Sequence, residues 1–81
     1  MRIKNKEQLK EFLNVVDKCK NDVYLMSVYG DRYNLKSELS KYVAIGDLLT
    51  SRGEYLEVFC NDKSDEGIFE KYFFEHPEVL K

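Results

Sequence analysis

The sequence predicts a two-layer α+β sandwich in which helices cover one face of a partly antiparallel sheet. The 81 residues are 43% hydrophobic and 14% aromatic, a composition typical of one packed domain over residues 1–81. Apolar residues recur with helical spacing in two long segments, and short segments rich in β-formers lie between them. The turn signal Gly30-Asp31 joins two of the short segments, which predicts a hairpin and therefore antiparallel pairing.

The first half of the chain is predicted to contain a helix followed by this hairpin. Residues 1–4 alternate apolar and polar side chains and are predicted to form a brief edge strand. Asn5 is a suitable N-cap for an amphipathic helix of about fourteen residues, since apolar side chains follow at helical spacing. Residues 23–29 are predicted to form a central strand, and Arg32–Asn34 a short returning strand.

The second half is predicted to contain two helices with one strand between them. Ser37 is the natural N-cap of a short helix that includes Leu39, Tyr42, Val43 and Ile45. Residues 46–53 are predicted to be a connection in which Leu48 and Leu49 make packing contacts. Residues 55–60 have strand composition, and Ser64 or Asp65 is expected to cap the last helix. The first and last helices carry the widest apolar stripes and should be the main cover of the sheet.

Charge and hydropathy exclude two classes of partner. Thirteen basic residues stand against fifteen acidic ones, so the chain lacks the basic excess that a broad nucleic-acid interface needs. No apolar run approaches the roughly 20 residues of a membrane span, and the N-terminal residues lack a secretory apolar stretch. We therefore expect a cytoplasmic protein that binds neither nucleic acid nor the membrane interior.

The residues that usually carry catalysis or bind metals are scattered. Cys19 and Cys60 form no CxxC pair and have no histidine nearby, so they are expected to be reduced core residues. A disulfide between them would require the fold to bring them together. His76 has no orienting partner in the sequence and is expected on the surface near a helix end. The sequence thus predicts no enzyme, no cofactor and no metal site.

The segment Asn34-Leu35-Lys36-Ser37, together with Gly30, resembles the HPr phosphocarrier family of the bacterial sugar phosphotransferase system. In that family a helix leads to a strand, a glycine turn, a short strand that ends in the same four residues, and a short helix. Two further segments resemble the family, Arg52-Gly53-Glu54 and Asp65-Glu66. The resemblance covers roughly residues 6–74 and implies a four-stranded antiparallel sheet with helices on one face and the other face open.

The family's phosphorylated histidine has no counterpart in this chain. The place where the family has its histidine, arginine and proline, at the start of the first helix, is taken by Ile3-Lys4-Asn5-Lys6-Glu7. The chain is therefore expected to lack histidine phosphotransfer. Lys4 and Lys6 flank the predicted helix start and are candidates for binding an anion there, with two solvated lysines as the simpler alternative.

Ser37 is the second point where the resemblance implies chemistry. In bacterial relatives the matching serine is phosphorylated by an ATP-dependent kinase, and the modified protein binds a transcriptional regulator. The resemblance implies phosphorylation at Ser37 and partner contacts at Lys36, Leu39 and Tyr42. Glu38 departs from the family, since it adds a negative charge and replaces an apolar residue of the docking patch. The alternative is that Ser37 only caps a helix.

The expected function is that of a regulatory module that binds proteins. Its partners would be phosphotransferase-system enzymes or a transcriptional regulator, and a catabolite-repression relative that also lacks the histidine gives the precedent. The alternative is a small regulatory or ligand-binding domain of ferredoxin-like fold, unrelated to phosphotransfer. Strand order distinguishes the two, and the sequence leaves strand order and oligomeric state open.

Overall fold

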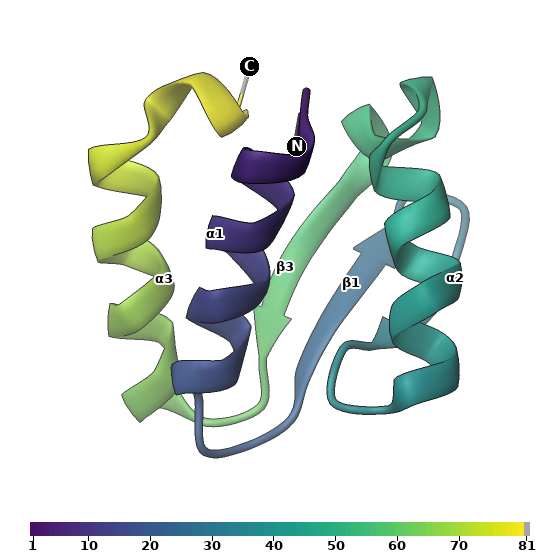
Figure 1. The fold of residues 1–81 in the computed structure, drawn as a ribbon. Helices are drawn as coiled ribbons and strands as arrows, with labels where there is room; N and C mark the ends of the chain where they lie inside the picture. Colours follow the sequence, from purple (N-terminus) through teal and green to yellow (C-terminus); the bar gives the residue numbers. More distant parts are fainter. Residues whose placement is uncertain (81) are drawn as a thin grey trace.

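A computed structural model describes residues 1–80, with the side chains of residues 51 and 52 left out, so the predicted match at Arg52 lies outside the described side chains. The helices and strands, in chain order, are α1 (Lys6–Lys18), β1 (Val23–Ser27), β2 (Arg32–Asn34), α2 (Glu38–Leu48), η1 (Ser51–Tyr55), β3 (Leu56–Cys60), α3 (Lys63–Glu75) and η2 (Pro77–Leu80). Figure 1 shows α3 and α1 side by side and α2 further to the right, with the strands behind the helices, which confirms the α+β class.

Within the described residues the sheet has three antiparallel strands in the order β2-β1-β3. Leu25 in the central strand pairs with Tyr33 of β2 and with Val58 of β3. Side chains alternate across a strand, so Leu25 is fully buried under the helices while its neighbour Met26 is exposed on the opposite face. The helices thus cover one face of the sheet, as predicted, and the other face is open to solvent.

The predicted edge strand at residues 1–4 is not formed, so the sheet has three strands where four were expected. The nitrogen of Met1 donates to Gly53 O at 3.0 Å and to Leu56 O at 3.3 Å. The N–H of Arg2 turns the other way and donates to Val79 O at 2.6 Å. The apolar–polar alternation arises because Met1 and Ile3 are buried, and burial alone does not require a ladder of backbone bonds.

Helix α1 confirms the predicted N-cap at Asn5. Its Oδ1 accepts the N–H of Gln8 at 2.9 Å, and the Gln8 Oε1 accepts the N–H of Lys4 at 2.8 Å. This reciprocal pair acts like a capping box displaced by one residue. On the inner side of the helix Phe12 is fully buried, and its ring contacts those of Phe69 at 5.9 Å and Tyr72 at 6.2 Å. α1 and α3 thus share one aromatic core.

Strand β1 ends at Ser27, two residues earlier than predicted. The Ser27 hydroxyl oxygen accepts the N–H groups of Tyr29 and Asp31, both at 3.1 Å, and so replaces the ladder with a side-chain-capped turn. Gly30 completes the turn at φ 93°, a conformation that favours glycine. Val28 and Tyr29, which favour strands, therefore lie exposed in the turn. The hydrogen bonds to Ser27 outweigh their β-propensity.

Helix α2 is longer than the predicted short helix and includes part of the expected connection. It runs through Gly46 to Leu48, although an interior glycine costs about 1 kcal/mol relative to alanine. Burial of Ala44 and Leu48 offsets this cost, since both side chains lie in the core. Leu48 is thus the packing contact that was predicted, whereas the prediction was wrong for Leu49, which is exposed.

Helix α3 begins earlier than predicted, at Lys63. Asp62 is the N-cap and accepts the N–H of Ser64 at 2.8 Å, so neither Ser64 nor Asp65 caps the helix. Asp65 is only 2% exposed and accepts the N–H groups of Lys20 at 3.1 Å and Asn21 at 2.9 Å. Asp65 therefore fastens the first turn of α3 to the loop that follows α1.

None of the helices within residues 1–80 is both long and apolar enough to cross a membrane.

Candidate functional site

The segment Asn34-Leu35-Lys36-Ser37 joins β2 to α2, and each of its residues has a separate structural role. Asn34 makes the turn, because its Oδ1 accepts the N–H of Lys36 at 2.9 Å and its carbonyl accepts the N–H of Ser37 at 3.1 Å. Leu35 lies in the core. These contacts direct the chain into α2 with Ser37 at the N-cap position.

Ser37 occupies the predicted position but does not cap through its side chain. Its hydroxyl accepts no hydrogen bond from the first turn of α2, although its carbonyl accepts the N–H of Lys41 at 2.8 Å. The residue is half-buried. The first-turn N–H groups of Glu38, Leu39 and Ser40 therefore lack a side-chain cap, which leaves the positive end of the helix dipole open to an anion.

Lys36, one of the predicted partner contacts, binds within its own chain. Its ammonium group donates to the carbonyl oxygens of Val16 at 2.8 Å and of Cys19 at 2.7 Å. Both carbonyls lie at the C-terminal end of α1, where the helix dipole favours a cation. Lys36 thus fixes the start of α2 against the end of α1.

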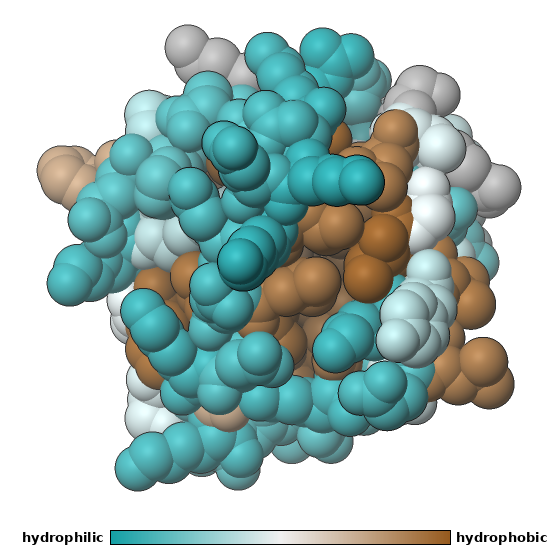
Figure 2. Space-filling model, in the orientation of Figure 1, coloured by the Kyte–Doolittle hydropathy of each residue, from teal (hydrophilic) through white to brown (hydrophobic). Residues whose placement is uncertain are grey.

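The two other predicted contacts lie together on the outer side of α2. Leu39 is 78% exposed and Tyr42 is 66% exposed, and Val43 beside them is 51% exposed. Positions i, i+3 and i+4 share one face of a helix, so these three side chains form a single outer stripe. Figure 2 shows apolar atoms on this outer, right-hand side of α2. Val43 was not predicted to be a partner contact. Its spacing from Leu39 fits a buried stripe and an exposed stripe equally well.

Lys4 and Lys6 lie at the opposite end of α1 from Ser37. α1 has 13 residues, so roughly 20 Å separate its two ends. Among the described residues neither ammonium group makes an ion pair, and both side chains are exposed. The side chain of Asn5 already accepts the N–H of Gln8 in the first turn of α1. The structure therefore places the predicted anion-binding lysines, Lys4 and Lys6, at a different end of α1 from the predicted phosphorylation site at Ser37.

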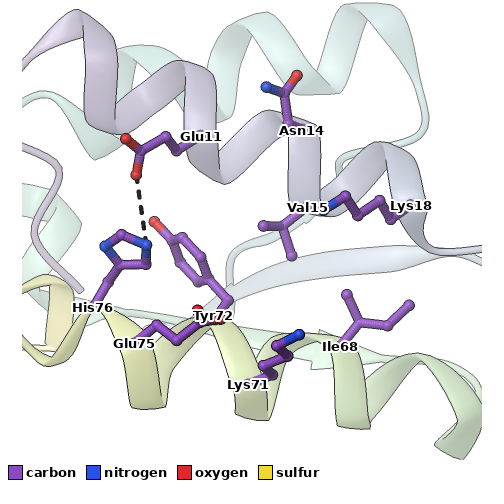
Figure 3. A pocket seen from close by; sticks show the side chains of 9 residues that line it. All are labelled: Glu11, Asn14, Val15, Lys18, Ile68, Lys71, Tyr72, Glu75 and His76. Carbon is purple, nitrogen blue, oxygen red and sulfur yellow. Dashed lines mark ion pairs between the residues drawn. The ribbon is translucent and has the colours of Figure 1, made fainter.

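A groove of about 500 Å³ runs between α1 and α3 (Figure 3). His76 lies at one end of it, with Nε2 3.7 Å from Glu11 Oε2 and Nδ1 3.4 Å from Glu78 Oε1. The phenol of Tyr72 points toward Glu11 and His76. Burial, with the charges of Glu11 and Glu78, raises the pKa of Tyr72 to about 12, so the phenol stays protonated at neutral pH. It can donate a hydrogen bond but cannot serve as a base.

The two cysteines are buried and free, as predicted, and the fold brings them close enough to affect each other. Burial, with the nearby Cys19 thiol, raises the pKa of Cys60 to about 11. Burial also raises the pKa of Cys19, whose thiol donates to Val15 O at 3.5 Å. Both thiols therefore stay protonated near neutral pH and are poor nucleophiles and poor metal ligands. No group of side chains within the described part of the chain could hold a metal ion.

Comparison of the chain with protein-family models, with curated proteins and with solved structures finds no significant match.

Proposed function

We propose that the chain is a regulatory, protein-binding module of the HPr-like kind, which does not transfer phosphoryl groups through a histidine. The observation that carries this proposal is the apolar stripe of Leu39, Tyr42 and Val43 on the outer side of α2, directly after Ser37. A helix that is apolar on two sides usually has both sides covered. The core covers the inner side of α2, and a partner protein would cover the outer stripe.

Strand order supports the HPr-like part of this proposal over the ferredoxin-like alternative. In both folds, one strand precedes the second helix in the chain and another follows it. A third strand lies between these two in the sheet. In a ferredoxin-like sheet that strand precedes the first helix, whereas here it is β1, which follows α1. The N-terminal segment also lies beside β3, through the bond from Met1 to Leu56 O, where the resemblance puts the first strand.

The geometry around Ser37 supports its role as a phosphorylation site. A phosphate there would meet the uncapped N–H groups of the first turn and the positive end of the helix dipole, which favours the modified state by about 0.3–1 kcal/mol. Lys41 lies one turn further on and pairs with Glu38 at 3.8 Å, so it can also attract the phosphate. Glu38 opposes the modification, because it places a second negative charge beside the phosphate.

The proposed partners are those of the regulatory HPr relatives, namely phosphotransferase-system enzymes or a transcriptional regulator in the cytoplasm. The proposed function does not include phosphoryl transfer through a histidine, because the residues at the start of α1, Asn5 and its neighbours, include no imidazole. His76 lies at the C-terminal end of α3, against Glu11 and Glu78.

Intact-mass spectrometry after two incubations tests the proposal. In ATP with HPr kinase, the chain should gain about 80 Da, one phosphoryl group, and Ser37→Ala should abolish the gain. In phosphoenolpyruvate with the general phosphotransferase enzyme, no gain is expected. A gain of mass in the second incubation would contradict the proposed absence of phosphotransfer. No gain in either incubation would contradict a role in phosphotransferase signalling.

The docking surface has a separate test with a matched control. Leu39→Ser should weaken binding of the phosphorylated chain to the transcriptional regulator by about ten-fold, because it removes an apolar anchor. Val28→Ser removes a similarly exposed side chain, 73% exposed, on the β1–β2 turn and should leave binding unchanged. Equal effects of the two variants would show that α2 is not the docking surface.

A further inference from the structure

Strand β3 leaves one edge of the sheet unpaired over part of its length. The N–H of Asn61 donates to Asp22 O at 3.1 Å, so by the alternation of an antiparallel ladder Phe59 and Glu57 also bond toward β1. The backbone groups of Val58 and Cys60 consequently point away from the sheet. Among the described residues, only Leu56 O on this edge receives a bond, from Met1.

The two edges of the sheet differ in how they are protected. β2 at one edge has three residues and begins with a charged side chain, Arg32, whose guanidinium lies 4.0 Å above the Tyr24 ring. Short length and charge are the usual protection of an edge strand. β3 at the other edge has five residues and contains no lysine, proline or glycine. Its one charged side chain, Glu57, is acidic, so the strand is suited to pairing with a basic segment.

A groove of about 230 Å³ runs along the unpaired edge, between β3 and α3. Its apolar wall consists of Val58, Phe59, Phe69 and Phe73. A second groove of about 340 Å³ shares Val58 and Phe73 and extends it toward Met1 and Leu80. The edge thus offers backbone groups and apolar surface along the same line.

The rim of these grooves is acidic. Glu66 and Glu70 line the first groove and Glu57 lines the second, and all three are exposed. Glu66 and Glu70 are four residues apart on α3, a spacing at which like charges repel. Within residues 1–80 none of the three carboxylates forms an ion pair. A cationic occupant would relieve this repulsion.

We propose that the β3 edge binds an extended segment of a partner protein, added to the sheet as a fourth strand, that carries both apolar and basic side chains on the face that α3 covers. Val58 and Cys60 would exchange backbone hydrogen bonds with the segment. Its apolar side chains would lie against Phe69 and Phe73. Lysines or arginines on the same face of the segment would lie near Glu66 and Glu70, which sets the preference for a basic sequence.

A second copy of this chain fits the edge less well than a basic segment. Pairing of β3 with β3 about a twofold axis would bring Glu66 and Glu70 of both copies toward the same edge. Four carboxylates would then face one another without a cation, which disfavours the dimer. The charge at the rim therefore identifies a basic partner.

The test uses a nine-residue capped peptide in which two lysines and two valines repeat, so that each face of the strand carries both kinds of side chain. A peptide with glutamate in place of each lysine is the control. The ¹⁵N-labelled chain is titrated with each peptide and amide exchange is measured. The lysine peptide should bind and slow exchange at the Val58 and Cys60 amides, which do not bond to β1. The glutamate peptide should not bind.

Charge reversal on α3 supplies the matched variants. Glu66→Lys with Glu70→Lys should weaken binding of the lysine peptide by about ten-fold or more, and the effect should shrink at high salt. Glu75→Lys reverses one charge on the side of α3 that faces α1 and should leave the affinity within about two-fold, whereas Glu70→Lys alone should weaken it clearly.

A variant of the backbone tests the strand pairing itself. Val58→Pro removes an outward N–H without removing a bond to β1, and it should abolish binding if the peptide pairs with β3. Arg32→Pro is the control at the other edge, and circular dichroism checks that both variants are folded. If Val58→Pro does not fold, protection of the Val58 and Cys60 amides decides the question.

Three results would overturn the proposal. They are no binding of the lysine peptide at about 1 mM, equal affinity for the doubly reversed variant, and amide changes at Met26 or on α2 in place of β3. The doubly substituted variant Leu39→Ser, Tyr42→Ser should bind the peptide as well as the native chain does. The proposal for the β3 edge can thus be tested independently of the proposal for the α2 surface.

Discussion

Helices α1 and α2 lie on the same face of the sheet, yet their outer sides differ. α1 buries Phe12 and Val16 and presents charged and polar side chains to solvent. α2 buries Ala44 and Leu48 and presents Leu39 and Tyr42 to solvent. Figure 2 shows the difference, with hydrophilic atoms in front of α1 and apolar atoms at the outer side of α2.

This difference separates stability from recognition. The amphipathic α1 is completed by contacts within the chain, so its inner residues should dominate the free energy of unfolding. The outer residues of α2 contact little in the described structure, so their substitution should change binding far more than stability. Substitutions in the core and on the outer side of α2 test that separation.

The largest effect is expected at Phe12. Phe12→Ala should lower the free energy of unfolding by about 3–5 kcal/mol, because it opens a cavity where the rings of Phe69 and Tyr72 meet. Urea denaturation followed by circular dichroism measures the loss. If the variant is unfolded without urea, Phe12→Leu should show a smaller loss in the same direction. An unchanged urea midpoint in either variant would contradict the central role of α1.

Removal of the Lys36 ammonium group should have the next largest effect. Lys36→Met should lower the free energy of unfolding by about 1–2 kcal/mol, because Val16 O and Cys19 O lose a charged donor. Lys41→Met is the control, since its ion pair with exposed Glu38 is worth less than about 1 kcal/mol. Equal losses in urea denaturation would show that Lys36 acts only as a surface charge.

Asp65 should make stability depend on pH. The N–H groups of Lys20 and Asn21 hold the pKa of its carboxyl below the usual 3.8. Its contribution is therefore present above the unfolded pKa and is lost as pH falls through the lower folded pKa. The urea midpoint should drop below about pH 4, and Asp65→Asn should flatten this part of the profile. The exposed Asp17→Asn serves as control, and a profile unchanged by Asp65→Asn would contradict the prediction.

The smallest effect on stability is expected from the outer stripe of α2. Leu39→Ser together with Tyr42→Ser should change the free energy of unfolding by less than about 0.5 kcal/mol. Leu48→Ser, on the inner side of the same helix, should cost several times more, because Leu48 lies in the core. A large loss in the double variant would mean that the outer stripe supports the fold and is not reserved for a partner.

Local signals predicted those parts of the fold in which neighbouring residues decide the structure. Asn5 and Gln8 lie within one turn, so the start of α1 followed from their spacing. The end of α2 did not, because Leu48 is held by the core and Gly46 is an unfavourable local residue. The burial of Asp65 depends on the loop after α1, which is 44 residues away in the sequence.

The candidate site was predicted to a similar extent. Ser37 was placed correctly because serine is a common N-cap residue. The exposure of Tyr42 could not be predicted, since the same spacing from Leu39 describes a core stripe and an outer stripe equally well. The use of Lys36 as a cap for α1 required knowing that α2 starts where α1 ends.

The central position of β1 has a consequence for the order of folding. Its ladder with β2 closes between Met26 and Arg32, six positions apart, whereas its ladder with β3 closes between Ser27 and Leu56, 29 positions apart. The longer closure costs roughly 1.4 kcal/mol more in chain entropy. We expect the β1–β2 hairpin to form early and β3 to join late. During synthesis, β1 would therefore pair with β2 first and would pair with β3 only after Leu56 and the residues that follow it have left the ribosome.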